Sequence, residues 1–368
     1  MQRKKDRRSN RKEDSDLINY KMNWSKYFYS TIVLIFFVTA GSYLATSCKK
    51  DQNKKELNLL TQEIPSGFPN PVYQFHDNPL SEEGFQLGKK IFYDGRLSVD
   101  GVHPCSSCHQ QIGAFGTFEH DRSHGAYNSH TLRNAPVLFN LAWYTSYHWD
   151  GAYTTLEDEC AQPINTHFEM GGSWDAVIKL MEQDAEYRDQ FQKVFRTAFI
   201  KPEYVEKALA QFTGSILSFD SRFDRYKKGT GVISAQELNG YTLYQAYCAT
   251  CHPEPLFTDF SYRNIGLPVD SYLNDFGRMR LTKNSQDSLK FRVPTLRNCY
   301  ISSNYMHDGR FNTLFQCLEH YRSGVQQSPT LDPLLRNGIP LTAPQEEDIY
   351  QFLKTLTDSS ILINPRYH

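Results

Sequence analysis

The pattern Cys-x-x-Cys-His occurs twice in this chain, and it constrains the fold more than any other feature. The first copy is Cys105-Ser106-Ser107-Cys108-His109, and the second is Cys248-Ala249-Thr250-Cys251-His252. This pattern attaches a c-type haem, because the two thiols add to the haem vinyl groups and the His becomes the proximal ligand of the iron. A structural zinc site built from two Cys-x-x-Cys pairs is the alternative, but zinc does not need a His directly after each pair. We therefore expect two covalently bound haem c groups.

The order of motifs is repeated at a coarse level along the chain. Each half has an amphipathic helix, the haem motif, a Thr-Leu-Arg-Asn segment and an aromatic-Asp-Gly turn. Apart from the haem motifs, these segments are 87–92, 131–134 and 149–151 in the first half, and 238–244, 295–298 and 307–309 in the second. The repetition predicts a mainly α fold of two tandem cytochrome c-like domains, each with one covalently bound haem.

Signals for helix ends and turns predict the domain boundaries. Ser234 and Glu237 form a capping box that starts the first helix of the second domain, and Thr342 opens a last helix. The linker 227–231 is rich in Lys and Gly and marks a boundary between domains. We expect four parts in chain order: a signal or anchor segment at 1–48, a tether at 49–79, and cytochrome c-like domains at 80–228 and 229–368.

The N-terminal segment has a basic region followed by an apolar run from about residue 27 to 44. This is the organisation of a secretory signal. Small residues precede Cys48, as in a bacterial lipoprotein box, which predicts a lipid attached at this Cys. An uncleaved membrane anchor is the alternative, because the apolar run is just long enough to span a bilayer. Both alternatives predict a periplasmic protein tethered to the membrane through Cys48 or through the apolar segment.

The charge balance bears on the partners of the protein. Lys and Arg number 40, Asp and Glu number 41, and the formal net charge is −1. A nearly neutral chain argues against nucleic acid as the main partner.

The second axial position of each iron distinguishes an electron carrier from a site for peroxide. Aligning Trp149 with His307 places Tyr321 of the second half opposite Pro163 of the first half. Proline cannot bind iron, so the position that could supply a ligand to the second haem supplies none to the first. We therefore expect the two haems to differ in function.

Cleavage of peroxide needs an acid–base group on the open face of the first haem. Five polar residues of the first half are candidates: His124, His130, Glu159, His167 and Glu169. Glu169 lies between aromatic and small residues, and a Glu whose pKa is raised by an apolar pocket suits this task. An exposed loop Glu is the alternative interpretation.

The chain resembles the bacterial di-haem cytochrome c peroxidases and the related MauG-type enzymes over about residues 66 to 357. Motifs that carry the resemblance occur in the family's order at 87–94, 133–136, 148–151, 168–170, 293–298 and 306–310. The resemblance implies that His109 binds the peroxidatic iron and His252 the iron of the electron-transfer haem. It implies that Glu169 is the catalytic acid–base and that Trp149 lies between the haems, although a buried core Trp is also compatible with the motif.

The resemblance also assigns roles near the first haem and between the domains. His124 would cap the first haem in the oxidised resting enzyme and leave on activation. Glu159 takes the place of a Gln near the peroxide pocket. Asn134 would be a side-chain ligand of an interdomain Ca²⁺, with backbone carbonyls near Ser302 and Asn304, because a hard cation prefers oxygen. The family also tends to form homodimers.

Tyr321 is the main departure from the typical peroxidases. They place a Met at this position, which raises the potential of the second haem, whereas the MauG-type enzymes place a Tyr. A phenolate ligand favours the ferric and higher states of the iron. Met306 and His320 are the alternative ligands, with Tyr321 then a packing residue.

Three functions are compatible with the sequence. The leading one is reduction of hydrogen peroxide to water with electrons from a small periplasmic donor such as a cytochrome c. The second is a MauG-type enzyme that uses peroxide to oxidise a protein or another substrate. The third is a non-enzymatic di-haem electron relay or sensor.

Overall fold

The computed structural model describes residues 56–368. Cys48 and the predicted signal or anchor segment lie outside these residues. Within 56–368, the helices are too short or too polar to cross a membrane. The described part is mainly helical, with two small two-stranded antiparallel sheets, in agreement with the prediction of a mainly α fold.

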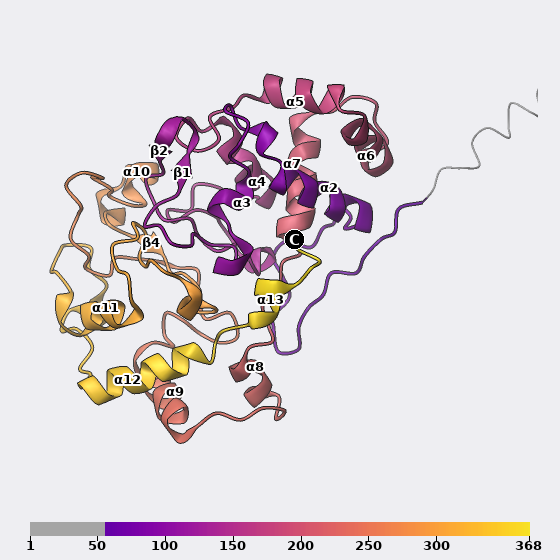
Figure 1. Ribbon diagram of the computed structural model, residues 1–368. Coiled ribbons are helices and arrows are strands. Elements are labelled where there is room, and N and C mark those ends of the chain that lie inside the picture. The colour runs from indigo at the N-terminus through magenta and orange to yellow at the C-terminus, as the bar shows by residue number, and fades with distance from the viewer. Residues whose placement is uncertain (1–55) are drawn as a thin grey trace, which may run out of the picture. The chain divides into compact units, whose positions relative to one another are not determined.

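In the first half, helix α2 (Glu82–Tyr93) packs against α7 (Pro202–Thr213) (Figure 1). Ser81 caps α2 by accepting a hydrogen bond from the Gly84 amide. Where the two helices meet, a Cβ atom on Gly88 would overlap the carbonyl oxygen of Ala208, so only Gly permits this close backbone approach. The apolar faces of both helices are buried in one core, and the close crossing of the helices forms the centre of that core.

The second half repeats this arrangement with α9 (Ala235–Tyr247) and α12 (Ala343–Lys354), which lie side by side in Figure 1. The predicted capping box at Ser234 and Glu237 is confirmed. A Cβ atom on Gly240 would overlap the carbonyl oxygen of Asp348, as at the crossing in the first half. The two halves are therefore the two cytochrome c-like units that the repeated motifs predict.

Shorter elements connect these helices. Those of the first half are η2 (Gly95–Leu97), α3 (Cys105–Cys108), η3 (Gln111–Gly113), β1 (His124–Gly125), η4 (Ala126–Asn128), β2 (Ser129–His130), η5 (Leu141–Trp143), α4 (Leu156–Asn165), α5 (Trp174–Gln183) and α6 (Ala185–Phe195). The next helix, α8 (Arg222–Lys227), contributes Phe223 to the core of the second half. Those of the second half are β3 (Tyr262–Arg263), α10 (Met279–Thr282), η6 (Ser285–Asp287), β4 (Phe291–Arg292), η7 (Cys299–Ile301), α11 (Leu314–Glu319), the π-helix η8 (His320–Gly324), η9 (Pro333–Leu335) and α13 (Ser359–Ile363).

The last residues return to the first half. Ile361 of α13 and Tyr367 are buried in the same core as α2 and α7. The Tyr93 hydroxyl donates a hydrogen bond of 2.8 Å to the Tyr367 carbonyl, and Lys89 Nζ donates one of 3.2 Å to the Arg366 carbonyl. Figure 1 shows the C-terminus beside the helices of the first half. The predicted boundary near residue 228 is thus crossed by a tail that completes the first core.

The structure corrects one detail of the repeat. The sequence suggested that 131–134 corresponds to 295–298, but the structural counterpart of Asn298 is Asn140. Both residues have a left-handed backbone, with φ of 57° and 56°, and both begin a short 3₁₀ helix. Both amides donate to Ser218, Asn140 to its carbonyl and Asn298 to its hydroxyl. The alignment of Trp149 with His307 is confirmed, because an isolated β-bridge encloses each turn at equivalent positions. Tyr147 pairs with Tyr153 in the first half, and Tyr305 pairs with Phe311 in the second.

Candidate active site

The first cavity has a volume of about 400 Å³ and is lined by both thiols and the His of the first haem motif. His109 Nδ1 lies 3.0 Å from the Phe115 carbonyl, and this contact fixes the ring and leaves Nε2 as the nitrogen available to a metal. Burial lowers the pKa of His109 to about 4, so the imidazole is neutral, which is the form that binds iron. Glu159, Pro163 and Glu169 line the same cavity.

The second cavity has a volume of about 490 Å³ and repeats this arrangement. His252 Nδ1 lies 3.0 Å from the Phe257 carbonyl, and burial lowers the pKa of this His as well. Cys248 and Cys251 line the cavity beside it. The seven cysteines of the described part are free thiols, so both pairs are available for thioether bonds. The residues present therefore fit a covalently attached haem in each half.

Glu169 lies in the turn that follows α4. Its amide donates to the Thr166 carbonyl, and its carbonyl accepts from the Ala126 amide, which fixes the backbone next to β1. Burial raises the pKa of the Glu169 carboxyl to about 7. Among the described residues, its buried Oε2 has no hydrogen-bond partner. A half-buried carboxyl whose pKa is close to neutral is suited to both accepting and donating a proton.

The first cavity contains polar residues beyond those that the sequence predicted. Within residues 56–368, four oxygens of its lining side chains are buried without a hydrogen-bond partner, and they belong to Asp150, Glu159, Gln162 and Glu169. Gln162 was missed, although it follows Glu159 by three positions and shares its face of α4. His148 was missed as a cavity residue. His130 and His167, two of the five polar candidates, are not among the described residues that line this cavity.

Trp149 lines both cavities, as expected for a residue between the haems. Its indole Nε1 donates a hydrogen bond of 2.8 Å to the Asn134 carbonyl, and its own carbonyl accepts one of 2.7 Å from the Arg292 amide. Asn134 also lines both cavities, and its amide donates to the His307 carbonyl. The contact between the two halves is therefore built around Trp149.

His124 lies in β1, which pairs with β2 so that His124 faces His130. The His124 ring is exposed, and its centroid is 4.3 Å from that of His130 and 4.7 Å from that of His120. His124 lines the first cavity. The next residue, Gly125, lies against the backbone of Phe168 and Glu169, which places this strand beside the proposed acid–base.

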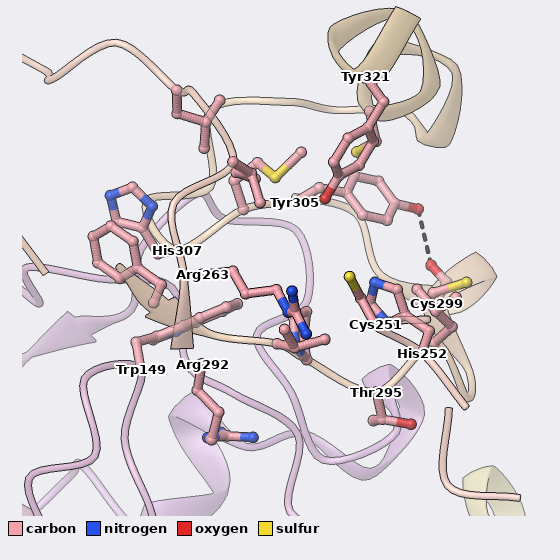
Figure 2. Close-up of a pocket in the computed structure, with 18 of the residues that line it drawn as sticks. Trp149, Cys251, His252, Arg263, Arg292, Thr295, Cys299, Tyr305, His307 and Tyr321 are labelled. Carbon is pink, nitrogen blue, oxygen red and sulfur yellow. Dashed lines mark hydrogen bonds between the residues drawn. The ribbon is translucent and has the colours of Figure 1, made fainter. Parts of the chain in front are cut away.

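Tyr321 lies in the π-helix η8 and lines the second cavity. Figure 2 shows its side chain pointing into this cavity, with Cys251 and His252 below it and Trp149 at the lower left. Met306 also lines the cavity. His320 is absent from the cavity lining found in residues 56–368, and its Nε2 lies 2.9 Å from the Ile265 carbonyl. Of the three candidate ligands, two therefore face the cavity.

The predicted calcium ligands were also located. Asn134, Ser302 and Asn304 all line the second cavity. The Asn304 carbonyl accepts a hydrogen bond from the Ser302 hydroxyl, and the Ser302 carbonyl accepts one from the Tyr305 hydroxyl. In the part of the chain that the structure describes, no group of three or more His, Cys, Asp or Glu residues is arranged to hold a metal ion.

Comparisons with known proteins agree with this architecture. A family model described as di-haem cytochrome c peroxidase matches residues 82–231. The methylamine utilization protein MauG of Methylorubrum extorquens is 31% identical over 334 residues, which cover 87% of this chain and 92% of that protein. The cytochrome c551 peroxidase of Nitrosomonas europaea is 33% identical over 283 residues, covering 76% of this chain and 81% of that protein.

One solved structure is also similar over most of the chain. The crystal structure of a MauG-like protein associated with microbial copper homeostasis has a TM-score of 0.77 and is 32% identical, covering 84% of this chain and 99% of that one. The curated relatives include proteins named MauG and proteins named cytochrome c peroxidase, and both kinds match most of this chain. This chain belongs to the di-haem cytochrome c peroxidase family, whose members are oxidoreductases that act on peroxide and carry haem c.

Proposed function

We propose that this protein reduces hydrogen peroxide to water with electrons from a small redox protein such as a cytochrome c. One observation carries the proposal most directly. Glu169 places an unpartnered, buried carboxyl oxygen in the lining of the cavity that holds the first Cys-x-x-Cys-His motif, within the described residues. When bound, the haems supply the electron transfer and the binding of peroxide oxygen to iron.

The side chains of the chain would handle protons and position the reactants. Glu169 would take a proton from the oxygen of peroxide nearer the iron and return it to the leaving oxygen. Pro163 also lines the first cavity and occupies the position that Tyr321 has in the second half, and a proline cannot bind iron. Trp149 would carry electrons between the halves. It lines both cavities, and it is hydrogen-bonded to Asn134 of the first half and to Arg292 of the second.

Tyr321 supports a second candidate function. A tyrosine that binds the second iron would stabilise its oxidised states and make the haem harder to reduce. We therefore keep the MauG-type reaction as an alternative, in which peroxide is used to oxidise a protein or another substrate. The relatives named MauG match this chain over a similar length to those named peroxidase. A non-enzymatic di-haem relay or sensor is a third candidate, which a strong second ligand on the first iron, such as His124, would support.

Other features of the proposal concern location and assembly. We propose a periplasmic protein that is tethered through Cys48 or through the apolar segment, because c-type haems are attached outside the cytoplasm. We also propose an interdomain Ca²⁺ held by Asn134 and nearby carbonyl oxygens, and a homodimer as the assembled state. The domain boundary near residue 228 is part of the same proposal.

Steady-state reduction of hydrogen peroxide by the full chain with both haems attached tests the leading function. Reduced cytochrome c serves as donor, and Glu169→Gln removes the titrating group while keeping its size. We expect turnover by the wild type and a loss of about 10²- to 10⁴-fold in the variant. Glu182→Gln, at an exposed position of α5, is the matched control. Oxidation of both haems by peroxide without turnover would instead support the MauG-type reaction.

A further inference from the structure

We propose that His148 and Glu159 form a second proton-handling pair in the first cavity, distinct from Glu169, in which Glu159 stores a proton and His148 positions and recharges it. The proposal rests on the proposed reduction of peroxide to water. It extends that function, because it assigns the source of a proton that Glu169 cannot supply.

The two side chains are in contact and line the same cavity. His148 Nε2 lies 3.2 Å from Glu159 Oε2. Glu159 projects from α4, whereas His148 precedes Trp149 in a turn where its own backbone is left-handed, with φ of 60°. Arg292 of the second half donates a hydrogen bond of 3.2 Å from Nε to the His148 carbonyl. This contact holds the backbone of the turn, and the imidazole packs edge-to-face against the Tyr153 ring, with centroids 5.0 Å apart.

The protonation of the pair follows from its surroundings. Burial raises the pKa of Glu159 to about 8 and lowers that of His148 to about 4, so both groups are neutral at pH 7. A carboxylate Oε2 would have no hydrogen-bond partner among the described residues, whereas a protonated Oε2–H can donate to the unprotonated Nε2. A neutral, hydrogen-bonded pair therefore explains the contact better than an ion pair between charged groups.

The neighbouring charges act on each member separately. Arg292 and the backbone of His148 favour the carboxylate form of Glu159, whereas Glu169 and Asp150 disfavour it. The phenols of Tyr147 and Tyr153 also lie within its electrostatic range.

His148 is surrounded by charges of both signs. Asp150 favours its protonation, whereas Arg133, Arg292 and His109 oppose it. For both members of the pair, burial outweighs these charges.

The balance of the reaction requires protons that Glu169 does not provide. Reduction of one peroxide to two waters consumes two electrons and two protons. Glu169 moves one proton from the near oxygen to the leaving oxygen, which consumes none. The second oxygen leaves as water only after two electrons from the redox donor and two protons from outside have arrived. Glu159 would give one of these protons. A proton from solvent would then bind His148 Nε2 and pass to the Glu159 carboxylate, which returns both groups to their neutral forms.

Infrared difference spectroscopy of the oxidised, resting full chain in H₂O and D₂O tests the pair without any turnover. Since Glu169 is also about half protonated at pH 7, we expect two carboxylic-acid carbonyl bands, of which one, assigned to Glu159, disappears in Glu159→Gln and the other in Glu169→Gln. In His148→Gln the Glu159 band should persist at a shifted frequency, because the acceptor of its hydrogen bond has changed. Glu182→Gln, which removes an exposed carboxyl, should leave both bands unchanged. A spectrum identical in wild type and Glu159→Gln would overturn the proposal.

Turnover adds a readout that a purely structural role would not change. Glu159→Gln should lower kcat by about 10²-fold, the lower end of the range for loss of one positioned proton donor, with KM for peroxide retained. His148→Gln should lower kcat less and increase the solvent isotope effect. An unchanged kcat and isotope effect in both variants would contradict the proposal. An inactive wild type would refute the proposed function alone, because the infrared band would still report on the pair.

Discussion

The first and second cavities are built on the same frame but differ on the face opposite the proximal His. In each half a buried His is held through Nδ1 by a backbone carbonyl at 3.0 Å, beside two thiols. In each half a Thr-capped helix then supplies the opposite face, α4 in the first half and α11 in the second. The helix of the first half presents Pro163 and two acidic or amide side chains, whereas the segment after α11 presents Tyr321.

This difference shows how a duplicated unit acquires two functions. The helices and their caps keep the haem pocket, and the chemistry changes through a few side chains on one turn. α4 continues as a regular helix through Pro163, while the chain after α11 forms a π-helix that contains Tyr321. A π-helix rotates the following side chains relative to an α-helix and is frequent at functional sites. The predictions below test this comparison.

Pro163→Tyr should make the first cavity resemble the second. The phenol would provide a ligand where Pro163 provides none, and peroxide could no longer reach the iron. We expect peroxide turnover to fall by about 10³-fold, within the range for losing access to a positioned acid–base. Steady-state kinetics and the absorption spectrum of the oxidised protein would measure this, with Tyr321→Phe as the converse change. A variant that keeps full turnover would show that Pro163 does not keep the site open.

Tyr367→Ala should show that the first half depends on the C-terminal tail. Tyr367 is buried against Phe85 and Phe115, with ring centroids 6.5 and 6.0 Å away. Loss of a buried aromatic ring should lower the free energy of unfolding by about 3 kcal/mol. Chemical denaturation would measure it, and Tyr272→Ala, which is 85% exposed, should change stability by less than about 0.5 kcal/mol. Equal effects would mean that the tail does not stabilise the first core.

Tyr321→Met should reduce the difference between this chain and the typical peroxidases. If the phenol binds the second iron, a thioether in its place should raise the reduction potential of that haem. We expect an increase on the order of 0.1 V, within the range of about 0.8 V that axial ligands span. Spectroelectrochemical titration of both haems would measure the change. The potential of the second haem would stay constant if Met306 were the ligand.

The pH dependence of peroxide reduction should report on the first cavity only. Burial raises the pKa of Glu169 to about 7. Below this pH the resting carboxyl is protonated and cannot take the proton of peroxide, so kcat/KM should fall about tenfold per pH unit and level off above it. Stopped-flow mixing with limiting peroxide would give the profile. In Glu169→Gln the residual rate should lose this step, and a profile that keeps it would assign the pKa to another group.

The sequence predicted the parts of the site that local patterns determine. Three of these patterns depend on short spacings, and the structure agrees with them: the haem motifs, the capping box at Ser234, and the alignment of Trp149 with His307 as equivalent positions. Such patterns can be recognised in the sequence because they determine local backbone geometry and hydrogen bonds between residues that are close along the chain.

Features that depend on tertiary packing were not predictable in the same way. The alignment of 131–134 with 295–298 was wrong by six residues. The same sequence, Thr-Leu-Arg-Asn, occurs in both segments, but the two segments have different backbone conformations. His148 lies in a left-handed turn that the sequence did not indicate, whereas Gln162 could have been predicted from its spacing of three residues after Glu159 on α4. His320 lies outside the described cavity lining and Tyr321 lies within it, in a π-helix that no short motif indicates.

The C-terminal tail has a consequence for how the protein is made. Ile361 and Tyr367 belong to the core that α2 and α7 begin, yet they follow the whole second half in the sequence. If the protein is exported from its N-terminus, the first Cys-x-x-Cys-His motif reaches the periplasm before these two side chains do. The first core would then still be incomplete at that moment. We therefore expect its thiols to be accessible for haem attachment before the core is closed by the tail.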